Sequence, residues 1–137
     1  MDSKTKLLSR VPLFAGLDED GLAKVASLTD EVDLRAGTQL LQEGAFPYEF
    51  FLIVEGSVAI DRDGAQVSTL GPGDFLGEIA LVDGGRRTAS ARAETDVRVL
   101  VLGRREFHTL VNQFPEVRES VLSALAERVR RLDTSAD

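Results

Sequence analysis

A glycine-rich stretch followed by two arginines holds the residues of this sequence best suited to chemistry. Residues 71–90 contain five of the chain's twelve glycines. Within them, residues 78–81 can form one helical turn before the glycine pair at 84–85 ends it. Free backbone N–H groups at the start of such a turn favour an anion such as phosphate. Arg86 and Arg87 follow directly, and a guanidinium group can hold two phosphate oxygens at once.

Glu78 adds a second possible contact. Residues 71–92 carry three acidic and three basic side chains, so this part is neutral in a chain of net charge -7, and an anion is tolerated there. A carboxylate beside an anion site can accept a hydrogen bond from a sugar hydroxyl. Phosphate and ribose together indicate a nucleotide. The alternative is an ordinary loop between strands with solvated arginines.

Composition excludes several other kinds of site. The chain has no Cys and one His, His108, which rules out disulfides, thiolate metal sites and sites built from two or three imidazoles. The net charge of -7 disfavours binding to nucleic acid or to anionic lipid. No apolar run approaches the roughly 20 residues that span a bilayer. We therefore expect a soluble, cytoplasmic protein, and the arginine-rich composition points to a GC-rich bacterial genome.

The middle of the chain has the pattern of β structure. Between residues 31 and 102, short apolar runs alternate with Gly, Pro and Asp at intervals of eight to twelve residues. The predicted strands cover 31–34, 38–41, 50–54, 58–61, 66–70, 88–91 and 97–101, and another strand ends near Phe75. Asp63-Gly64 predicts a hairpin turn, because it supplies the positive φ that such turns need. This many short strands predict a sandwich, jelly roll or small barrel.

Helical patterns flank this middle part. Residues 1–30 predict two helices broken near Pro12 and Gly16, the second capped by Asp18. Residues 104–132 predict two more helices, separated at Pro115. The last has an apolar stripe of Val117, Val121, Leu125, Val129 and Leu132, widened by Leu122. We expect residues 1–137 to form one domain.

Several spaced motifs together resemble a known family. Gly77-Glu78-Ile79-Ala80-Leu81, followed by Arg87-Thr88-Ala89-Ser90, resembles the phosphate-binding cassette of cyclic nucleotide-binding domains. Residues 11–17 are similar to the family's entry motif, and residues 37–56 to its early strands. The resemblance implies a mainly β fold, a jelly roll with N-terminal helices and two C-terminal helices.

The resemblance also implies roles for individual residues. Arg87 would pair with the cyclic phosphate, Glu78 would bind the ribose 2′-hydroxyl, and Thr88 would lie beside the phosphate. Backbone N–H groups around Ala80 would complete the phosphate site, and Gly77 would let the sugar approach. The ligand-binding set is Leu76, Gly77, Glu78, Ile79, Ala80, Arg87, Thr88 and Ala89. Arg86 has no implied role, and Arg128, Arg131 or Ser123 of the last helix could contact the base.

The function expected from these observations is a non-catalytic sensor of a cyclic nucleotide, cAMP with cGMP as the second candidate, with no cofactor or metal. The last helix would relay occupancy to another protein or to a second copy. The sequence ends before any DNA-reading helix-turn-helix, so we expect no direct contact with nucleic acid. One alternative is the same fold acting as an oligomerising scaffold without ligand. Another is a cupin-like metalloenzyme, which a single His disfavours.

Overall fold

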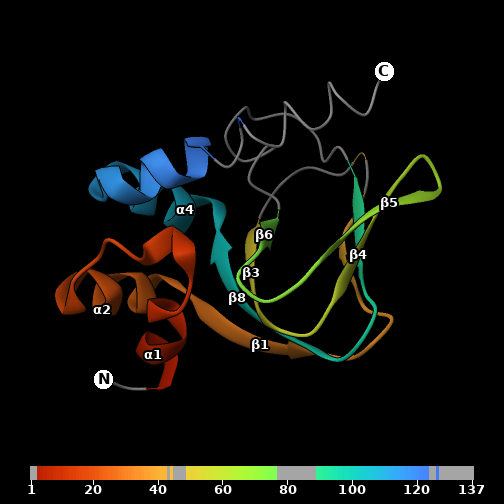
Figure 1. Cartoon of the computed structure of the whole chain (residues 1–137), viewed down its shortest axis with the longest axis horizontal. Coiled ribbons are helices and arrows are strands. Elements are labelled where there is room, and N and C mark those ends of the chain that lie inside the picture. Colours follow the sequence, from red (N-terminus) through yellow and green to blue (C-terminus); the bar gives the residue numbers. More distant parts are fainter. Residues whose placement is uncertain (1–2, 43, 45–48, 77–88, 124–125, 127–137) are drawn as a thin grey trace.

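Two four-stranded antiparallel sheets form the centre of the fold, and the helices gather on one side of them (Figure 1). The computed structural model describes residues 3–42, 44, 49–76, 89–123 and 126. One sheet has the strand order β1-β8-β3-β6 and the other β2-β7-β4-β5. The strands are β1 (Asp30–Leu34), β2 (Gln39–Leu41), β3 (Glu49–Glu55), β4 (Val58–Arg62), β5 (Ala65–Leu70), β6 (Phe75–Leu76), β7 (Ser90–Ala93) and β8 (Val97–Gly103).

Strands β3 and β8 of the first sheet are buried on both faces because two cores lie against them. Phe51 and Ile53 of β3 belong to a core between the two sheets, together with residues of β4, β7 and β8. Phe50 and Leu52 alternate with them and belong to a second core under the helices. We call these the inter-sheet core and the helix-side core. The continuous apolar runs of β3 and β8 follow from burial on both faces.

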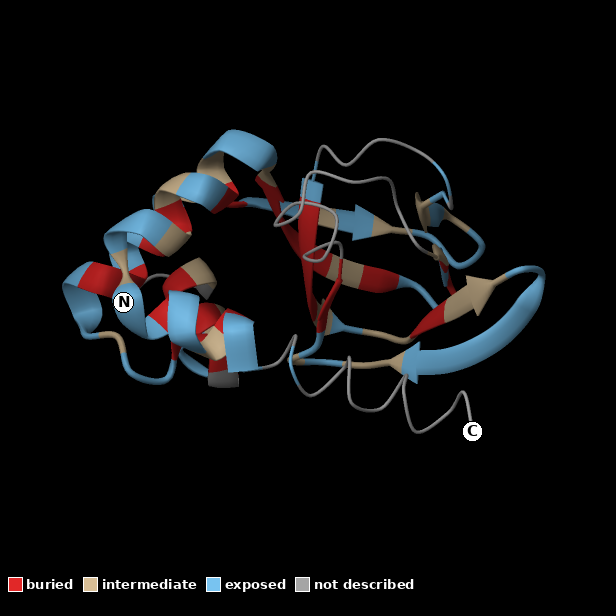
Figure 2. Ribbon diagram, turned by 90° about the horizontal axis from the view of Figure 1, so that it is seen from above, coloured by how far each residue is buried: buried red, intermediate tan, exposed pale blue. Residues whose placement is uncertain are grey.

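The helices precede and follow the strands in the order predicted. They are α1 (Ser3–Ser9), the 3-10 turn η1 (Pro12–Phe14), α2 (Glu19–Leu28) and α4 (Arg104–Gln113). The Asp18 carboxylate accepts a hydrogen bond of 2.8 Å from the backbone N–H of Gly21, which confirms the predicted N-cap of α2. The buried sides of the helices face the sheets (Figure 2). In the described part of the chain, no helix combines the length and apolar character needed to cross a membrane.

The predicted break near Pro115 is confirmed. Helix α4 ends at Gln113, Phe114 forms its C-cap in extended conformation, and residues 115–123 are again helical. Val117 and Val121 are buried in the helix-side core as the stripe predicted. Leu122 is 52% exposed, so its predicted place in the buried stripe is wrong. It follows Val121 by about 100° around the helix, which turns it away from the core.

The turn between β4 and β5 has the predicted chemistry. Asp63 has φ 53° and Gly64 has φ 82°, so both central residues are left-handed as a two-residue hairpin turn requires. Strand β7 begins at Ser90, two residues later than predicted. Ala alternates with polar residues both before and after Ser90, so the sequence pattern does not mark where the strand starts. Pairing with β4 and β2 sets its position.

Candidate functional site

The two ends of the glycine-rich stretch are fixed in different sheets. Leu76, the last residue of β6, is 3% exposed and pairs with Phe51 of β3. Ala89 is half-buried and directly precedes β7, which pairs with β4 and β2. The connecting residues 77–88 therefore begin at one sheet and end at the other. Both ends are held by paired strands, so the sequence that joins them starts and finishes at defined positions.

The turn before β6 is tied to β3. The backbone N–H of Gly71 donates to the Asp74 carboxylate at 2.9 Å, and the backbone N–H of Asp74 donates to the Gly71 carbonyl at 3.0 Å. The N–H of Ile53 donates to the Asp74 carbonyl at 2.9 Å, and the N–H of Gly73 to the Ile53 carbonyl at 2.8 Å. Asp74 thus closes the turn that leads into Phe75 and Leu76.

The inter-sheet core is buried at its centre and half-buried at its margin. Its centre includes Ala91 and Ala93 of β7, whose side chains are small and fully or almost fully buried. Half-buried apolar residues pack against it from the same sheet, among them Ile60 and Leu70. Ile60 is registered opposite Ala91. An apolar surface beside the end of the glycine-rich stretch suits the flat face of a base or a sugar.

The structure locates only some of the predicted site residues. Leu76 and Ala89 have the positions given above. Six others, Gly77, Glu78, Ile79, Ala80, Arg87 and Thr88, lie outside the described residues, as do Arg86, Arg128 and Arg131. Ser123 is exposed at the end of the helical residues 115–123.

His108 lies on α4, where its sequence pattern predicted a helix, and its ring is edge-on to that of Phe107, with the two ring centroids 6.1 Å apart. Among the described residues, no group of three or more His, Asp or Glu side chains could hold a metal ion. The cupin-like alternative therefore gains no support from this part of the chain.

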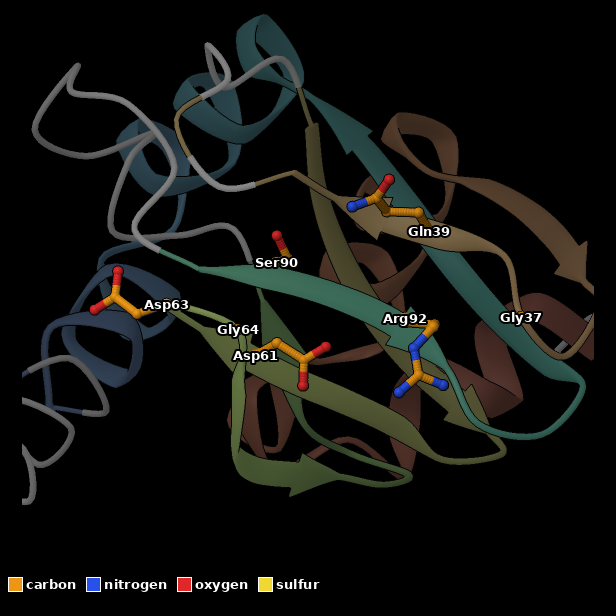
Figure 3. Close-up of a pocket in the computed structure, with 7 residues that line it drawn as sticks. All are labelled: Gly37, Gln39, Asp61, Asp63, Gly64, Ser90 and Arg92. Atoms are coloured by element: carbon orange, nitrogen blue, oxygen red, sulfur yellow. The ribbon is translucent and has the colours of Figure 1, made fainter.

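A cleft that sequence reasoning missed lies on the second sheet (Figure 3). It has a volume of about 430 Å³, is open to solvent and is lined by Gly37, Gln39, Asp61, Asp63, Gly64, Ser90 and Arg92. Arg92 alternates along β7 with Ala91 and Ala93, which face the inter-sheet core, so it lies on the opposite face of the sheet. We call this feature the outer cleft. Its residues lie on strands and turns and are up to 55 positions apart in the sequence, so no local motif could reveal the cleft.

One arginine of the first sheet, Arg98, is surrounded by acidic side chains. Arg98 of β8 contacts Asp33 at 2.9 Å, Glu55 at 3.4 Å and Glu31 at 3.5 Å. The hydrogen bond to Asp33, followed by the charges of Asp33, Glu55 and Glu31, raises the pKa of Arg98. This arginine is a structural cation surrounded by acids.

Comparison with known proteins relates this geometry to one family. The sequence matches the family described as "Cyclic nucleotide-binding domain" over residues 31–114, which is more than half of the chain and includes the whole glycine-rich stretch. A CRP-like cAMP-activated global transcriptional regulator of Mycobacterium tuberculosis is 30% identical over 135 residues, covering 95% of this chain and 60% of the relative.

Two solved structures are similar in fold. The Thermus thermophilus catabolite activator protein matches with a TM-score of 0.83 at 30% identity, over 92% of this chain and 62% of that one. The cAMP-bound PfPKA-R matches with a TM-score of 0.84 at 25% identity, over 96% of this chain and 45% of that one. The chain thus spans less than two thirds of the length of the mycobacterial relative and of each of these solved chains. With its two antiparallel sheets, flanking helices and matching sequence, the chain belongs to the cyclic nucleotide-binding domain family and has the jelly roll predicted for it.

Proposed function

We propose that this chain is a non-catalytic sensor that binds a cyclic nucleotide. One observation carries the proposal: the family match spans residues 31–114 and so includes both the glycine-rich stretch and the paired strands that hold its ends. The motif residues occur in order within that match, Gly77 to Leu81 and then Arg87 to Ser90. The chain therefore contains the motif residues in the family's order, and paired strands fix both ends of the segment that carries them.

Each motif residue has a chemical role in the proposed complex. Arg87 pairs its guanidinium with the cyclic phosphate, and Glu78 accepts a hydrogen bond from the ribose 2′-hydroxyl. Backbone N–H groups at Ile79 and Ala80 bind the phosphate at the start of the helical turn. Gly77 leaves room for the sugar, and Thr88 lies beside the phosphate. Leu76 and Ala89 connect these residues to β6 and β7.

The nucleotide we propose is cAMP. The mycobacterial relative is named as cAMP-activated, and the similar PfPKA-R structure is cAMP-bound. Thr88 beside the phosphate leaves cGMP as the second candidate. Both nucleotides present the same cyclic phosphate and ribose, so the roles of Arg87 and Glu78 are the same for either.

We further propose that occupancy is reported to a protein, either a different partner or a second copy of this chain. The net charge of -7 opposes binding to nucleic acid, which is a polyanion. The mycobacterial relative is a transcriptional regulator, and 60% of its length is covered by this chain.

Isothermal titration calorimetry of the full chain with cAMP and with cGMP tests the proposal. Wild-type protein should bind at least one of them, and Arg87→Gln should weaken binding roughly ten- to a hundredfold, because a charge-assisted hydrogen bond contributes about 1.5–3 kcal/mol. Arg86→Gln is the matched control. It removes the same charge one residue away and should change affinity little.

Two outcomes would contradict this function. If folded wild-type protein binds neither nucleotide at millimolar concentration, the scaffold alternative is favoured. If Arg86→Gln and Arg87→Gln weaken binding equally, the arginines act only through their net charge and the assigned role of Arg87 is wrong.

A further inference from the structure

The outer cleft contains an arginine and an aspartate that do not neutralise each other. Arg92 of β7 is registered with Ala59 of β4, and Asp61 is registered with Ser90, so Arg92 and Asp61 are diagonal neighbours on one face of the sheet. Diagonal neighbours lie about 7–8 Å apart, within reach of a long side chain. In the part of the chain that the structure describes, neither side chain makes an ion pair or a hydrogen bond.

Arg98 shows that the same chain can satisfy an arginine fully. It has three acidic partners within 3.5 Å on the other sheet. Two of these acids, Asp33 and Glu55, are registered directly opposite Arg98, whereas Asp61 is only diagonal to Arg92 and does not contact it. Figure 3 shows the Arg92 guanidinium and the Asp61 carboxylate on the same side of the sheet, each reaching towards the space between β7 and β4. One donor fork and one acceptor therefore remain available to a ligand.

The surrounding structure holds these two groups in place. β7 is paired with β2 on one side and β4 on the other, and β4 is paired with both β7 and β5. Gln39 of β2 is registered opposite Arg92, but its amide points away from the Arg92 guanidinium (Figure 3). Strand pairing fixes the backbone positions of Arg92 and Asp61, whereas the exposed Arg92 side chain still loses rotamer freedom on binding, so the site is expected to be weak.

We propose that the outer cleft binds a small zwitterion, a molecule that carries a carboxylate and an ammonium group. Its carboxylate would pair with Arg92 and its ammonium with Asp61. A neutral or singly charged ligand would leave either Arg92 or Asp61 without a partner. Asp63, the second acid of the lining, already has an interaction elsewhere. The volume of about 430 Å³ lies in the range of small-molecule sites and accommodates a free amino acid or a dipeptide.

This site lies on the opposite face of the sheet from the inter-sheet core and does not depend on nucleotide binding. Ala91 is buried in that core, whereas Ser90 and Arg92 on either side of it line the cleft. Failure of one proposal therefore leaves the other intact.

Titration of the ¹⁵N-labelled full chain by NMR tests the inference, with glycine and glycylglycine as separate probes. Amide shifts should be concentrated at residues 37–39, 61–64 and 90–92, and the stronger probe tells an amino acid from a dipeptide. Acetate alone and methylammonium alone carry one charge each and should bind about fivefold more weakly or worse, since an exposed ion pair contributes up to about 1 kcal/mol.

The variants separate a built site from surface charge. Arg92→Gln and Asp61→Asn should each reduce affinity about fivefold, by the same ion-pair contribution. Arg118→Gln and Glu119→Gln change exposed charges on the helical residues 115–123 and should leave the titration unchanged. The proposal is wrong if neither probe shifts the cleft amides at tens of millimolar, if acetate alone reproduces the shifts, or if the cleft variants titrate like wild type.

Discussion

At the scale of single residues, the glycines differ in what they do for the fold. Gly56, between β3 and β4, has φ 97°, and an added Cβ would lie 2.5 Å from both the Asp96 carbonyl oxygen and Val97 Cγ1. Gly64, in the β4–β5 hairpin, has φ 82° with nothing within 4 Å of such a Cβ. Gly56 thus meets two requirements, a left-handed backbone and close packing, whereas Gly64 meets only the first.

We predict that Gly56→Ala costs about 3 kcal/mol or more in free energy of unfolding, since backbone strain and overpacking add. Gly64→Ala is the matched control and should cost about 1–2 kcal/mol, the left-handed penalty alone. Urea unfolding followed by circular dichroism measures both. Equal costs would mean that the loop at Asp96 and Val97 moves aside without loss, and that close packing at Gly56 does not matter.

At the scale of elements, the sequence predicted the strands because most of them carry their own pattern. β3 and β8 are apolar runs bounded by turn residues, and Asp63-Gly64 marks the hairpin. β7 is different: its Ala-rich sequence has no preferred boundary, and pairing with β2 and β4 decides where it starts. Leu122 was misplaced for a similar reason, because an apolar residue at the margin of a helical stripe is buried only if a neighbour covers it.

The two proposed sites also differ in how far the sequence alone could predict them. The motif from Gly77 to Ser90 is contiguous and could be found in the sequence alone, and the family match includes it. The outer cleft joins Gln39, Asp61 and Arg92, which only the strand register brings together. Charged residues on separate strands give no local signal, so their proximity could not be predicted before the sheets were known.

An aromatic series connects α4 to the start of the glycine-rich stretch. The ring centroids of Phe107 and Phe50 are 4.9 Å apart, and those of Phe50 and Phe75 are 5.4 Å apart. Phe107 is 1% exposed and Phe50 is fully buried. Phe75 directly precedes Leu76, so this series ties the helix to the β6 end of the cassette through the helix-side core.

We predict that Phe107→Ala lowers the free energy of unfolding by about 3–5 kcal/mol, because truncating a buried aromatic residue loses transfer energy and leaves a cavity. Asn112→Ala, at an exposed position of the same helix, is the control and should change stability by no more than about 0.5 kcal/mol. Chemical denaturation measures both. If Phe107→Ala unfolds at the wild-type midpoint, α4 does not contribute to the packing that holds this side of the molecule.

At the scale of the whole molecule, one core lies beside the proposed nucleotide site and the other lies under the helices that we propose report its occupancy. The inter-sheet core lies beside the ends of the cassette, and the helix-side core receives α4 and the helical residues after Pro115. Residues 115–123 contribute Val117 and Val121 to it and leave Leu122 exposed. Pro115 lacks a backbone donor and begins a new helical direction, so the last helix joins α4 at a corner. Such a corner lets one helix move while the other stays packed.

We therefore predict that a cyclic nucleotide increases the protection of amide hydrogens in two places: in residues 71–90, where it binds, and from residue 115 onward, where the last helix packs down. The ligand shifts an existing equilibrium between helix positions, and it can do so only by as much as its affinities for the two positions differ. Hydrogen exchange of the full chain with and without saturating cAMP measures both regions. Arg87→Gln is the control, because it should lose both changes together at the same nucleotide concentration. If residues 71–90 become protected while residues 104–132 do not change, the nucleotide binds without moving the last helix, and occupancy must be reported by another surface.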